Sequence, residues 1–184
     1  MLKLIQGLAR CEQEKFYGWR LGMAQIDITG KAEQVSTCLG KSKCTCQILG
    51  VEGKNSEGIV CQRLQCMLCP PVPDKEVGET AKASMEWQNL PRIVSHAFSR
   101  EEIWRYTVQS GDTNPIHQGT HPMVPGLCMA WYLQRVLAIS SLHWKVSFHA
   151  PVYAGDVWTI VQDARQMVGY VDRKRVCTIR SIKK

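Results

Sequence analysis

The chain of 184 residues is 45% hydrophobic and 21% charged. This composition is close to the average of globular proteins, and it excludes a disordered chain or a fibrous repeat. The length allows one large domain or two small ones, because domains commonly contain about 100 to 200 residues.

An excess of basic residues predicts an attraction for polyanions. The sequence holds 23 Lys and Arg against 16 Asp and Glu, a formal charge of +7, which raises the local concentration of anions around a protein. Nucleic acid, phosphate-bearing small molecules and acidic proteins are candidates. The densest basic group, residues 173–175 with Arg180, has no helix-turn-helix or aromatic RNA-binding signature beside it. We therefore expect no nucleic-acid partner.

The apolar runs and the cysteines predict a cytoplasmic protein. No apolar run approaches the roughly 18 residues needed to cross a bilayer. Residues 1–6 have neither a long apolar core nor a small-residue cleavage site, so we expect no export and no membrane span. Nine cysteines would form disulfides in an exported chain, but the thiols of a cytoplasmic protein stay reduced.

The first part of the chain is predicted to be a helix followed by antiparallel strands. Apolar residues recur with helical spacing from Leu2 to about Trp19. The pattern becomes β-like from Ala32. Residues 43–49 and 59–66 then flank a polar loop with glycine at both ends, which is typical of a β-hairpin.

A proline-rich stretch separates this part from the next elements. Residues 70–83 begin with three prolines among four residues, and proline removes backbone donors and fixes φ, so we predict a linker. Residues 91–98 are predicted to form a strand. Residues 99–102 have the capping-box spacing that starts a helix, and this helix should end at Gly111.

The last part of the chain predicts a buried helix and an antiparallel meander. Residues 124–137 are apolar on nearly every face before Gln134, so this helix has to be buried. After it the apolar residues alternate with period two, interrupted by a turn at 154–156. The predicted strands are 144–148, 157–162, 167–171 and 176–182. This is an α+β layout in which a sheet wraps around one helix.

Residues 111–117, which read GDTNPIH, place a carboxylate and an imidazole in a loop. The glycine and the Asn-Pro pair prevent a helix here, and a curved loop can bring Asp112 and His117 together. Such a pair can share one water, polarise it and move its proton. The same spacing is also found where an aspartate caps a turn and the histidine has no chemical role. The spacing alone therefore leaves both interpretations open.

Two segments resemble the MaoC-like (R)-specific enoyl-CoA hydratases. Residues 98–117 are similar to the opening of these proteins, and residues 148–156 (FHAPVYAGD) are similar to their later strand and turn. The resemblance covers about residues 92–184 and implies a hot-dog fold, an antiparallel sheet around a central helix. It also implies that Asp112 and His117 are catalytic and activate the water added to an enoyl thioester. No cofactor is implied, because CoA or phosphopantetheine is part of the substrate.

The start of the apolar helix departs from the family pattern. The segment between His117 and this helix is shorter than the covering segment of the family, and Pro125 stands in place of a histidine. Trp131 lies near the place of a family serine. Residues 121–126 instead look like the helix start of the β-hydroxyacyl-ACP dehydratases, although the acid on their helix is absent.

The helix start nevertheless keeps a role that depends on its backbone. The N–H groups of Gly126 and Leu127 are predicted to bind the thioester oxygen as it gains negative charge, and we include Asn114 among the substrate-binding residues. An alternative for Gly126 is that it only permits close packing.

Two cysteine pairs offer an alternative site for a metal. Cys44 with Cys46, and Cys66 with Cys69, could supply four thiolates to zinc if the hairpin brings them together. Strand alternation places Cys44 and Cys46 on one face, where cysteine behaves as a small apolar residue. We therefore expect no metal.

Together these patterns predict a double hot-dog protein. Residues 1–75 form an incomplete hot-dog-like unit, residues 76–90 a linker and residues 91–184 the MaoC-like domain. The predicted activity is reversible hydration of an enoyl-CoA or enoyl-ACP, as in fatty-acid or polyketide-type metabolism. A non-catalytic acyl-thioester-binding protein and an acyl-CoA thioesterase are the alternatives. We expect a homodimer or higher homo-oligomer, and an unrelated N-terminal part is the alternative to the double unit.

Overall fold

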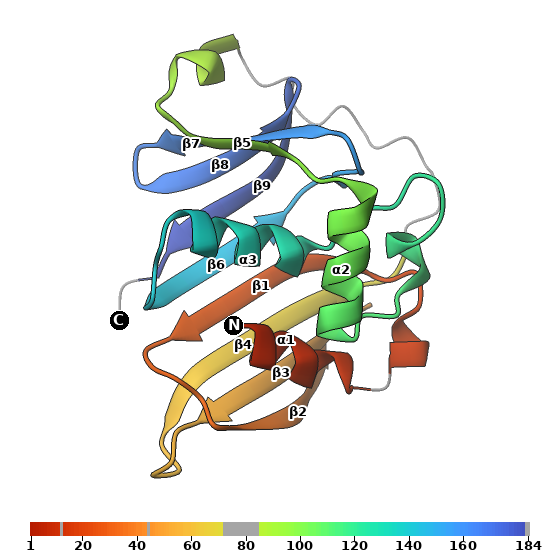
Figure 1. Ribbon diagram of the computed structural model, residues 1–184, viewed down its shortest axis with the longest axis vertical. Coiled ribbons are helices and arrows are strands. Elements are labelled where there is room, and N and C mark those ends of the chain that lie inside the picture. The colour runs from red at the N-terminus through yellow and green to blue at the C-terminus, as the bar shows by residue number, and fades with distance from the viewer. Residues whose placement is uncertain (12, 44, 72–84, 183–184) are drawn as a thin grey trace.

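One antiparallel sheet runs through the computed structural model, which describes residues 1–11, 13–43, 45–71 and 85–182 (Figure 1). Its nine described strands are ordered β2-β3-β4-β1-β6-β9-β8-β7-β5. They are β1 (Arg20–Ile28), β2 (Gln34–Lys43), β3 (Cys46–Lys54), β4 (Val60–Cys69), β5 (Arg92–Ala97), β6 (Leu142–Phe148), β7 (Val157–Asp163), β8 (Gln166–Val171) and β9 (Lys174–Ser181). The helices are α1 (Leu2–Ala9), α2 (Arg100–Ser110) and α3 (Gly126–Val136), with short 3-10 turns η1 (Gln13–Phe16), η2 (Met85–Asn89) and η3 (Pro115–His117).

The N-terminal half of the sheet, β2-β3-β4-β1, packs its inner face against α1 (Figure 1). Alternate residues of β1 are buried because successive side chains of a strand point to opposite faces. Ala24 and Ile26 are fully buried, with Leu4 of α1 in the same core. In the middle of the sheet β1 pairs with β6, where Ile26 lies opposite Trp144. The two halves of the sheet are therefore continuous.

The C-terminal half, β6-β9-β8-β7-β5, is covered by α3 (Figure 1). Leu127, Ala130 and Leu133 of α3 are buried, and Trp131 is partly buried against the same core. The predicted buried helix, the strand before α2 and the four strands after the buried helix are confirmed, with ends within about two residues of the predicted ones. The predicted meander holds for β7, β8 and β9 only, because β6 pairs with β9 rather than with β7. In the described residues, no helix combines the length and apolarity that a bilayer-spanning helix requires.

The N-terminal half departs from prediction before the hairpin. A helix from Leu2 to Trp19 is wrong, because α1 ends at Ala9 and the chain continues through η1. Strands begin at Arg20 rather than at Ala32. A register shift between Leu21 and Met23 interrupts the alternation of β1 at its start and conceals this strand. The hairpin itself is confirmed as β3 and β4.

The predicted linker falls mostly outside the described residues. Residues 72–84 are not described, so the boundaries 1–75, 76–90 and 91–184 stay a prediction. The end of that segment forms η2, where the Trp87 ring stacks on Tyr170 of β8 with a centroid separation of 4.8 Å. Trp87 and Leu90 pack with Val161, Val168 and Tyr170 in a second small apolar cluster. This last part of the segment is thus packed against the sheet.

Candidate active site

The loop that carries Asp112 and His117 is held at the end of a well-capped helix. The Ser99 hydroxyl accepts a hydrogen bond from the Glu102 N–H at 3.1 Å, and the Glu102 carboxylate accepts one from the Ser99 N–H at 2.8 Å. This is the predicted capping box. The helix ends at Gly111, whose φ of 76° lies in the left-handed region that glycine adopts without strain. The loop therefore leaves α2 at a defined residue.

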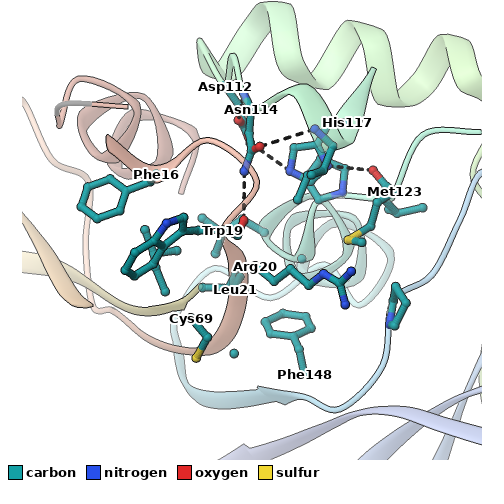
Figure 2. A pocket seen from close by; sticks show the side chains of 18 of the residues that line it. Phe16, Trp19, Arg20, Leu21, Cys69, Asp112, Asn114, His117, Met123 and Phe148 are labelled. Atoms are coloured by element: carbon teal, nitrogen blue, oxygen red, sulfur yellow. Dashed lines mark hydrogen bonds and ion pairs between the residues drawn. The ribbon is translucent and has the colours of Figure 1, made fainter. Parts of the chain in front are cut away.

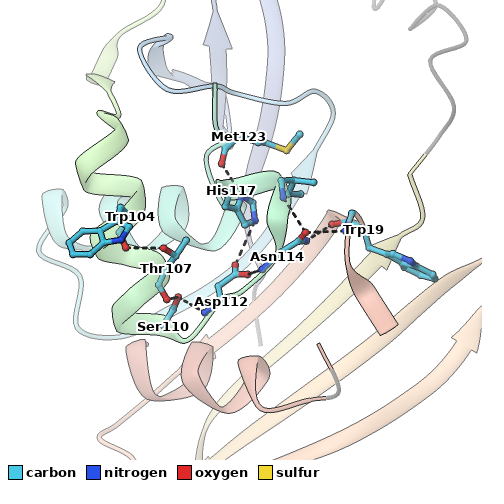
Figure 3. A network of polar contacts seen from close by, with 10 residues as sticks. Trp19, Trp104, Thr107, Ser110, Asp112, Asn114, His117 and Met123 are labelled. Atoms are coloured by element: carbon cyan, nitrogen blue, oxygen red, sulfur yellow. Dashed lines mark hydrogen bonds and ion pairs between the residues drawn. The ribbon is translucent and has the colours of Figure 1, made fainter. Parts of the chain in front are cut away.

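Asp112 and His117 converge, as the loop sequence predicts (Figure 3). Asp112 Oδ2 lies 3.6 Å from His117 Nε2, and the two side chains are 27% and 9% exposed. His117 Nδ1 lies 2.8 Å from the carbonyl oxygen of Met123. A carbonyl oxygen can only accept, so Nδ1 carries the proton and Nε2 of the neutral ring is an acceptor directed toward the carboxylate. Two acceptors at this separation can both receive hydrogen bonds from one water.

Asn114 ties this loop to the N-terminal half (Figure 3). Its side-chain amide donates to the carbonyl oxygen of Trp19 at 3.0 Å, and its Oδ1 accepts from the N–H of Gly18 at 3.0 Å. Oδ1 also accepts from the Ile116 N–H at 3.4 Å, which caps η3. The polar atoms of the side chain are therefore bonded to backbone. Asn114 lines the cavity described next, and its predicted contact with substrate stays a prediction.

A cavity of about 340 Å³ lies between the two halves, beside this loop (Figure 2). Asp112, Asn114 and His117 form its polar corner. Most of the remaining wall is apolar. The N-terminal half contributes Ile5, Leu8, Phe16, Trp19, Leu21, Leu49 and Leu68, and the C-terminal half contributes Ile116, Met123, Val124, Leu127, Met129, Phe148 and Val152. The cavity is therefore suited to an apolar chain that ends at a polar group.

The start of α3 also faces the cavity, through Gly126 and Leu127. A Cβ added to Gly126 would lie 2.8 Å from the Phe148 ring and 3.1 Å from Leu21. This crowding supports the alternative that glycine permits close packing here. The N–H groups of Gly126 and Leu127 also have no carbonyl of their own helix to bond, because they belong to the first turn. Packing and oxyanion binding are compatible, and the second stays a prediction.

The shortened segment before α3 is fixed by backbone bonds. Met123 forms an isolated bridge with Tyr153, and the Val124 N–H donates to the Val152 carbonyl at 2.8 Å. The His121 ring stacks on Tyr153 with a centroid separation of 4.7 Å. The same segment supplies the Met123 carbonyl that orients His117. It therefore positions the imidazole even though it is short.

Comparison with known proteins identifies the fold. No protein-family model matches the sequence, and no curated protein matches it. Among solved structures, peroxisomal multifunctional enzyme type 2 from Drosophila melanogaster aligns with 99% of this chain at 19% identity and a TM-score of 0.63. This chain spans 40% of the length of that enzyme. A MaoC-like dehydratase from Phytophthora capsici aligns with 91% of this chain and 72% of its own, at 12% identity and a TM-score of 0.56.

A thioesterase is also among the similar structures. The 12:0-ACP thioesterase from Umbellularia californica aligns with 97% of this chain and 82% of its own, at 12% identity and a TM-score of 0.54. The chain has a hot-dog fold. The hot-dog fold predicted from the sequence is thus confirmed, with the N-terminal unit of four described strands and the C-terminal unit of five in one sheet.

The cysteines of the N-terminal hot-dog unit do not gather around a metal site in the described residues. The hairpin brings Cys46 Sγ within 2.9 Å of Cys69 Sγ, but Cys66 is fully buried in the core and Cys44 lies outside the described residues. Burial, together with the hydrogen bond that Cys69 shares with Cys46, raises the pKa of Cys69 to about 11. Cys69 is therefore a thiol at neutral pH.

Sequence reasoning missed the residues that the N-terminal unit brings to the site. Trp19 and Gly18 hold Asn114 from more than 90 positions away, and Arg20 at the start of β1 lines the cavity. Their contacts depend on how the two units pair. The only local sequence signal for β1 was the recurrence of apolar residues at every second position, Ala24, Ile26 and Ile28, which the structure buries.

Proposed function

We propose that this protein catalyses the reversible hydration of an enoyl thioester. One observation carries the proposal: Asp112 Oδ2 and His117 Nε2 lie 3.6 Å apart at the polar corner of a largely apolar cavity. The resemblance of residues 98–117 and 148–156 to MaoC-like hydratases supports the reaction type. The similar solved structures include both dehydratases and thioesterases, and at these identities they support the fold alone.

In the proposed forward reaction, one water donates hydrogen bonds to both Asp112 and His117. The pair removes a proton from the water as its oxygen bonds to the β-carbon of the enoyl thioester. The electron pair of the C=C bond then moves toward the thioester, and the N–H groups of Gly126 and Leu127 bind its oxygen as negative charge develops. The proton returns to the α-carbon. The reverse sequence eliminates water from the 3-hydroxyacyl thioester.

The lining of the cavity favours an acyl chain as the variable part of the proposed substrate. Its walls are aliphatic and aromatic, and burying each CH₂ group contributes about 0.8 kcal/mol of binding. The acidic, basic and imidazole side chains of the described lining are Arg20, Asp112 and His117, with His149 at the border. A saturated or unsaturated hydrocarbon chain therefore fits better than a sugar or a nucleotide.

Two substitutions test the proposal. Asp112→Asn and His117→Ala should each lower the rate of crotonyl-CoA hydration by about 100-fold to 10,000-fold, followed as loss of the conjugated thioester absorbance. The double variant should be hardly slower than either single variant, because the pair acts on one water as a unit. The melting temperature should change little in Asp112→Asn, which keeps the shape of the side chain, and should fall in His117→Ala, which leaves the Met123 carbonyl without its partner. Rates are therefore compared at a temperature where both variants are folded.

The chain offers a matched control pair. His143 Nδ1 lies 2.9 Å from Asp27 Oδ1 on neighbouring strands, and neither residue lines the cavity. Asp27→Asn and His143→Ala should therefore keep the wild-type rate. If Asp112→Asn and His117→Ala also keep it, the catalytic assignment fails.

Product analysis with the same purified protein distinguishes hydration from the two alternative functions, a thioesterase and a non-catalytic binding protein. A thioesterase would release free CoA, which a thiol reagent detects, and would form no 3-hydroxyacyl-CoA. A non-catalytic binding protein would bind the thioester without consuming it. Either result with the wild-type protein would replace the hydratase proposal.

A further inference from the structure

A second, polar hollow of about 160 Å³ opens on the outer face of the C-terminal hot-dog unit. It is lined by Lys145, Ser147, His149, Gln166, Arg175, Thr178 and Arg180. The strand register explains why they meet: Lys145 lies opposite Arg180, and Ser147 lies opposite Thr178. The residues between them on β6 and β9 are buried in the core, so these side chains share the opposite face. We call this site the basic hollow.

The charge of the basic hollow is positive and unbalanced. Lys145, Arg175 and Arg180 line it, and none of the lining residues is acidic. None of these three cations forms an ion pair with a carboxylate in the described part of the chain. Burial, and after it Arg175 and Arg180, lowers the pKa of His149. Like charges held together without a counter-charge favour the binding of an anion.

The donors of the basic hollow suit a phosphate group. The Arg180 Nε donates to the Gln166 side chain at 3.0 Å, which leaves its two terminal nitrogens to bind oxygen in the bidentate manner of guanidinium and phosphate. Thr178 Oγ1 lies 2.9 Å from His149 Nε2, and Ser147 supplies a second hydroxyl. A volume of 160 Å³ is about half the lower limit for pockets that enclose a drug-sized molecule. The hollow therefore has room for a phosphate group rather than for a whole nucleotide.

The basic hollow and the cavity meet at the end of β6. His149 lines both of them, and the residues on either side of it, Phe148 and Ala150, line the cavity. A molecule whose thioester lies beside Asp112 and His117 can thus extend past His149 to the outer face. The acyl carriers CoA and phosphopantetheine are flexible arms that carry phosphate, so their charge suits the basic hollow and their flexibility suits a turn past His149.

We propose that the basic hollow binds a phosphate group of the thioester's carrier while the acyl chain occupies the cavity. This inference rests on the proposed function for the part that concerns the thioester. The phosphate has two sources, which share one chemistry: the 3′-phosphate of CoA and the phosphodiester of the pantetheine arm. It gives the basic group noted in the sequence at Arg175 and Arg180 a specific ligand.

Kinetics with the double variant Arg175→Ala and Arg180→Ala test the inference. The KM for crotonyl-CoA should rise about 10-fold or more, because a charge-assisted hydrogen bond to phosphate is lost at each position, and kcat should stay unchanged. Crotonyl-pantetheine, which has no phosphate, should be hydrated equally by the variant and the wild type. The double variant Arg165→Ala and Arg173→Ala is the matched control, since both arginines are exposed and lie outside the basic hollow. It removes the same charge and should change the KM less than twofold.

The source of the phosphate follows from two more substrates. If crotonyl-3′-dephospho-CoA has a raised KM that the double variant does not raise further, the hollow binds the 3′-phosphate. If its KM still depends on Arg175 and Arg180, the hollow binds the phosphate nearer the thioester. A KM for crotonyl-CoA that is the same in the variant, the control and the wild type overturns the inference.

A binding measurement keeps this test independent of catalysis. CoA itself, titrated into the protein by calorimetry, should bind the Arg175→Ala and Arg180→Ala variant about 10-fold more weakly than the control. The imidazole signals of His149 in NMR spectra should shift when CoA binds the wild type. If CoA binds as expected and crotonyl-CoA is not hydrated, the proposed function fails and the phosphate site stands. If hydration proceeds and CoA binding ignores both arginines, the phosphate site fails alone.

Discussion

The two hot-dog units contribute different things to one cavity. The C-terminal unit supplies the polar corner from one short loop, residues 112–117, and from the start of α3. The N-terminal unit supplies mostly wall: Leu8 of α1, Leu49 of β3 and Leu68 of β4. Reactive groups that must meet within hydrogen-bond distance are close in the sequence, whereas the shape of the cavity is assembled from elements far apart. In the proposed reaction the C-terminal unit alone therefore supplies the chemistry, whereas both units determine the size of the substrate.

Asn114 is the point where the two contributions depend on each other, because its side chain belongs to the loop and its partners belong to the N-terminal unit. Asn114→Ala would leave the Trp19 carbonyl and the Gly18 N–H without partners. We expect the free energy of unfolding to fall by about 1 to 3 kcal/mol, measured by urea denaturation. We also expect kcat for crotonyl-CoA to fall by about 10-fold or more, because the loop loses its support from the other unit.

Asn114→Asp serves as the graded variant. It keeps an acceptor for the Gly18 N–H and loses the donor to Trp19, so its loss of stability should lie between those of the wild type and Asn114→Ala. If Asn114→Ala lowers kcat and leaves stability unchanged, Asn114 contacts the substrate, as the sequence-based prediction has it, rather than joining the units.

The same contrast explains what the sequence could predict. In the C-terminal unit the alternation, the capping box at Ser99 and the loop 111–117 are local patterns, and all of them correspond to the structure. In the N-terminal unit β1 begins with a bulge and β2 is a polar edge strand, so neither follows a clean period of two. The contact of Asn114 with Trp19 depends on the pairing of the two units, which no local pattern encodes. The convergence of Asp112 and His117 was predictable, and its support was not.

The wall formed by the N-terminal unit should control chain length. Leu68→Phe narrows the cavity, so kcat/KM for octenoyl-CoA should fall about 10-fold, a size expected when a pocket loses room for a few methylene groups. The value for crotonyl-CoA should change less than twofold, because its four carbons stay near Asp112 and His117. Leu68→Ala should move the preference toward longer chains. Initial rates over a series of enoyl-CoA lengths measure both effects.

Met67→Phe provides the control on the same strand. Met67 does not line the cavity, and strand alternation directs it to the other face of β4 from Leu68. It should leave the chain-length profile of the wild type unchanged. An equal change for crotonyl-CoA and octenoyl-CoA in Leu68→Phe would contradict the division of labour between the units.

The cap of α2 should affect stability and leave the rate unchanged. It lies within the C-terminal unit, so it can be compared with Asn114, whose contacts join the two units. Burial would raise the pKa of Glu102, but hydrogen bonds from the Ser99 N–H and hydroxyl and the neighbouring His96 outweigh it and lower this pKa. A carboxyl whose pKa is lower in the folded state stabilises the fold above its unfolded pKa of about 4.3. That stability is lost as the pH falls through the folded pKa. Glu102→Gln should therefore cost about 1 kcal/mol at pH 7, and the difference from wild type should shrink below about pH 4.

The neighbouring Glu101 is the control for this last variant, because its exposed side chain pairs only with Arg105 on the same helix in the described residues. Glu101→Gln should change stability by about 0.5 kcal/mol or less. Glu102→Gln should leave kcat for crotonyl-CoA unchanged, since the cap lies at the end of α2 opposite Gly111 and the loop. A fall in kcat with Glu102→Gln as large as with Asn114→Ala would mean that α2 positions the loop as strongly as the N-terminal unit does. Thermal unfolding from pH 3 to pH 8 measures the effect of the cap on stability. Hydration rates of the same samples show whether α2 also positions the loop.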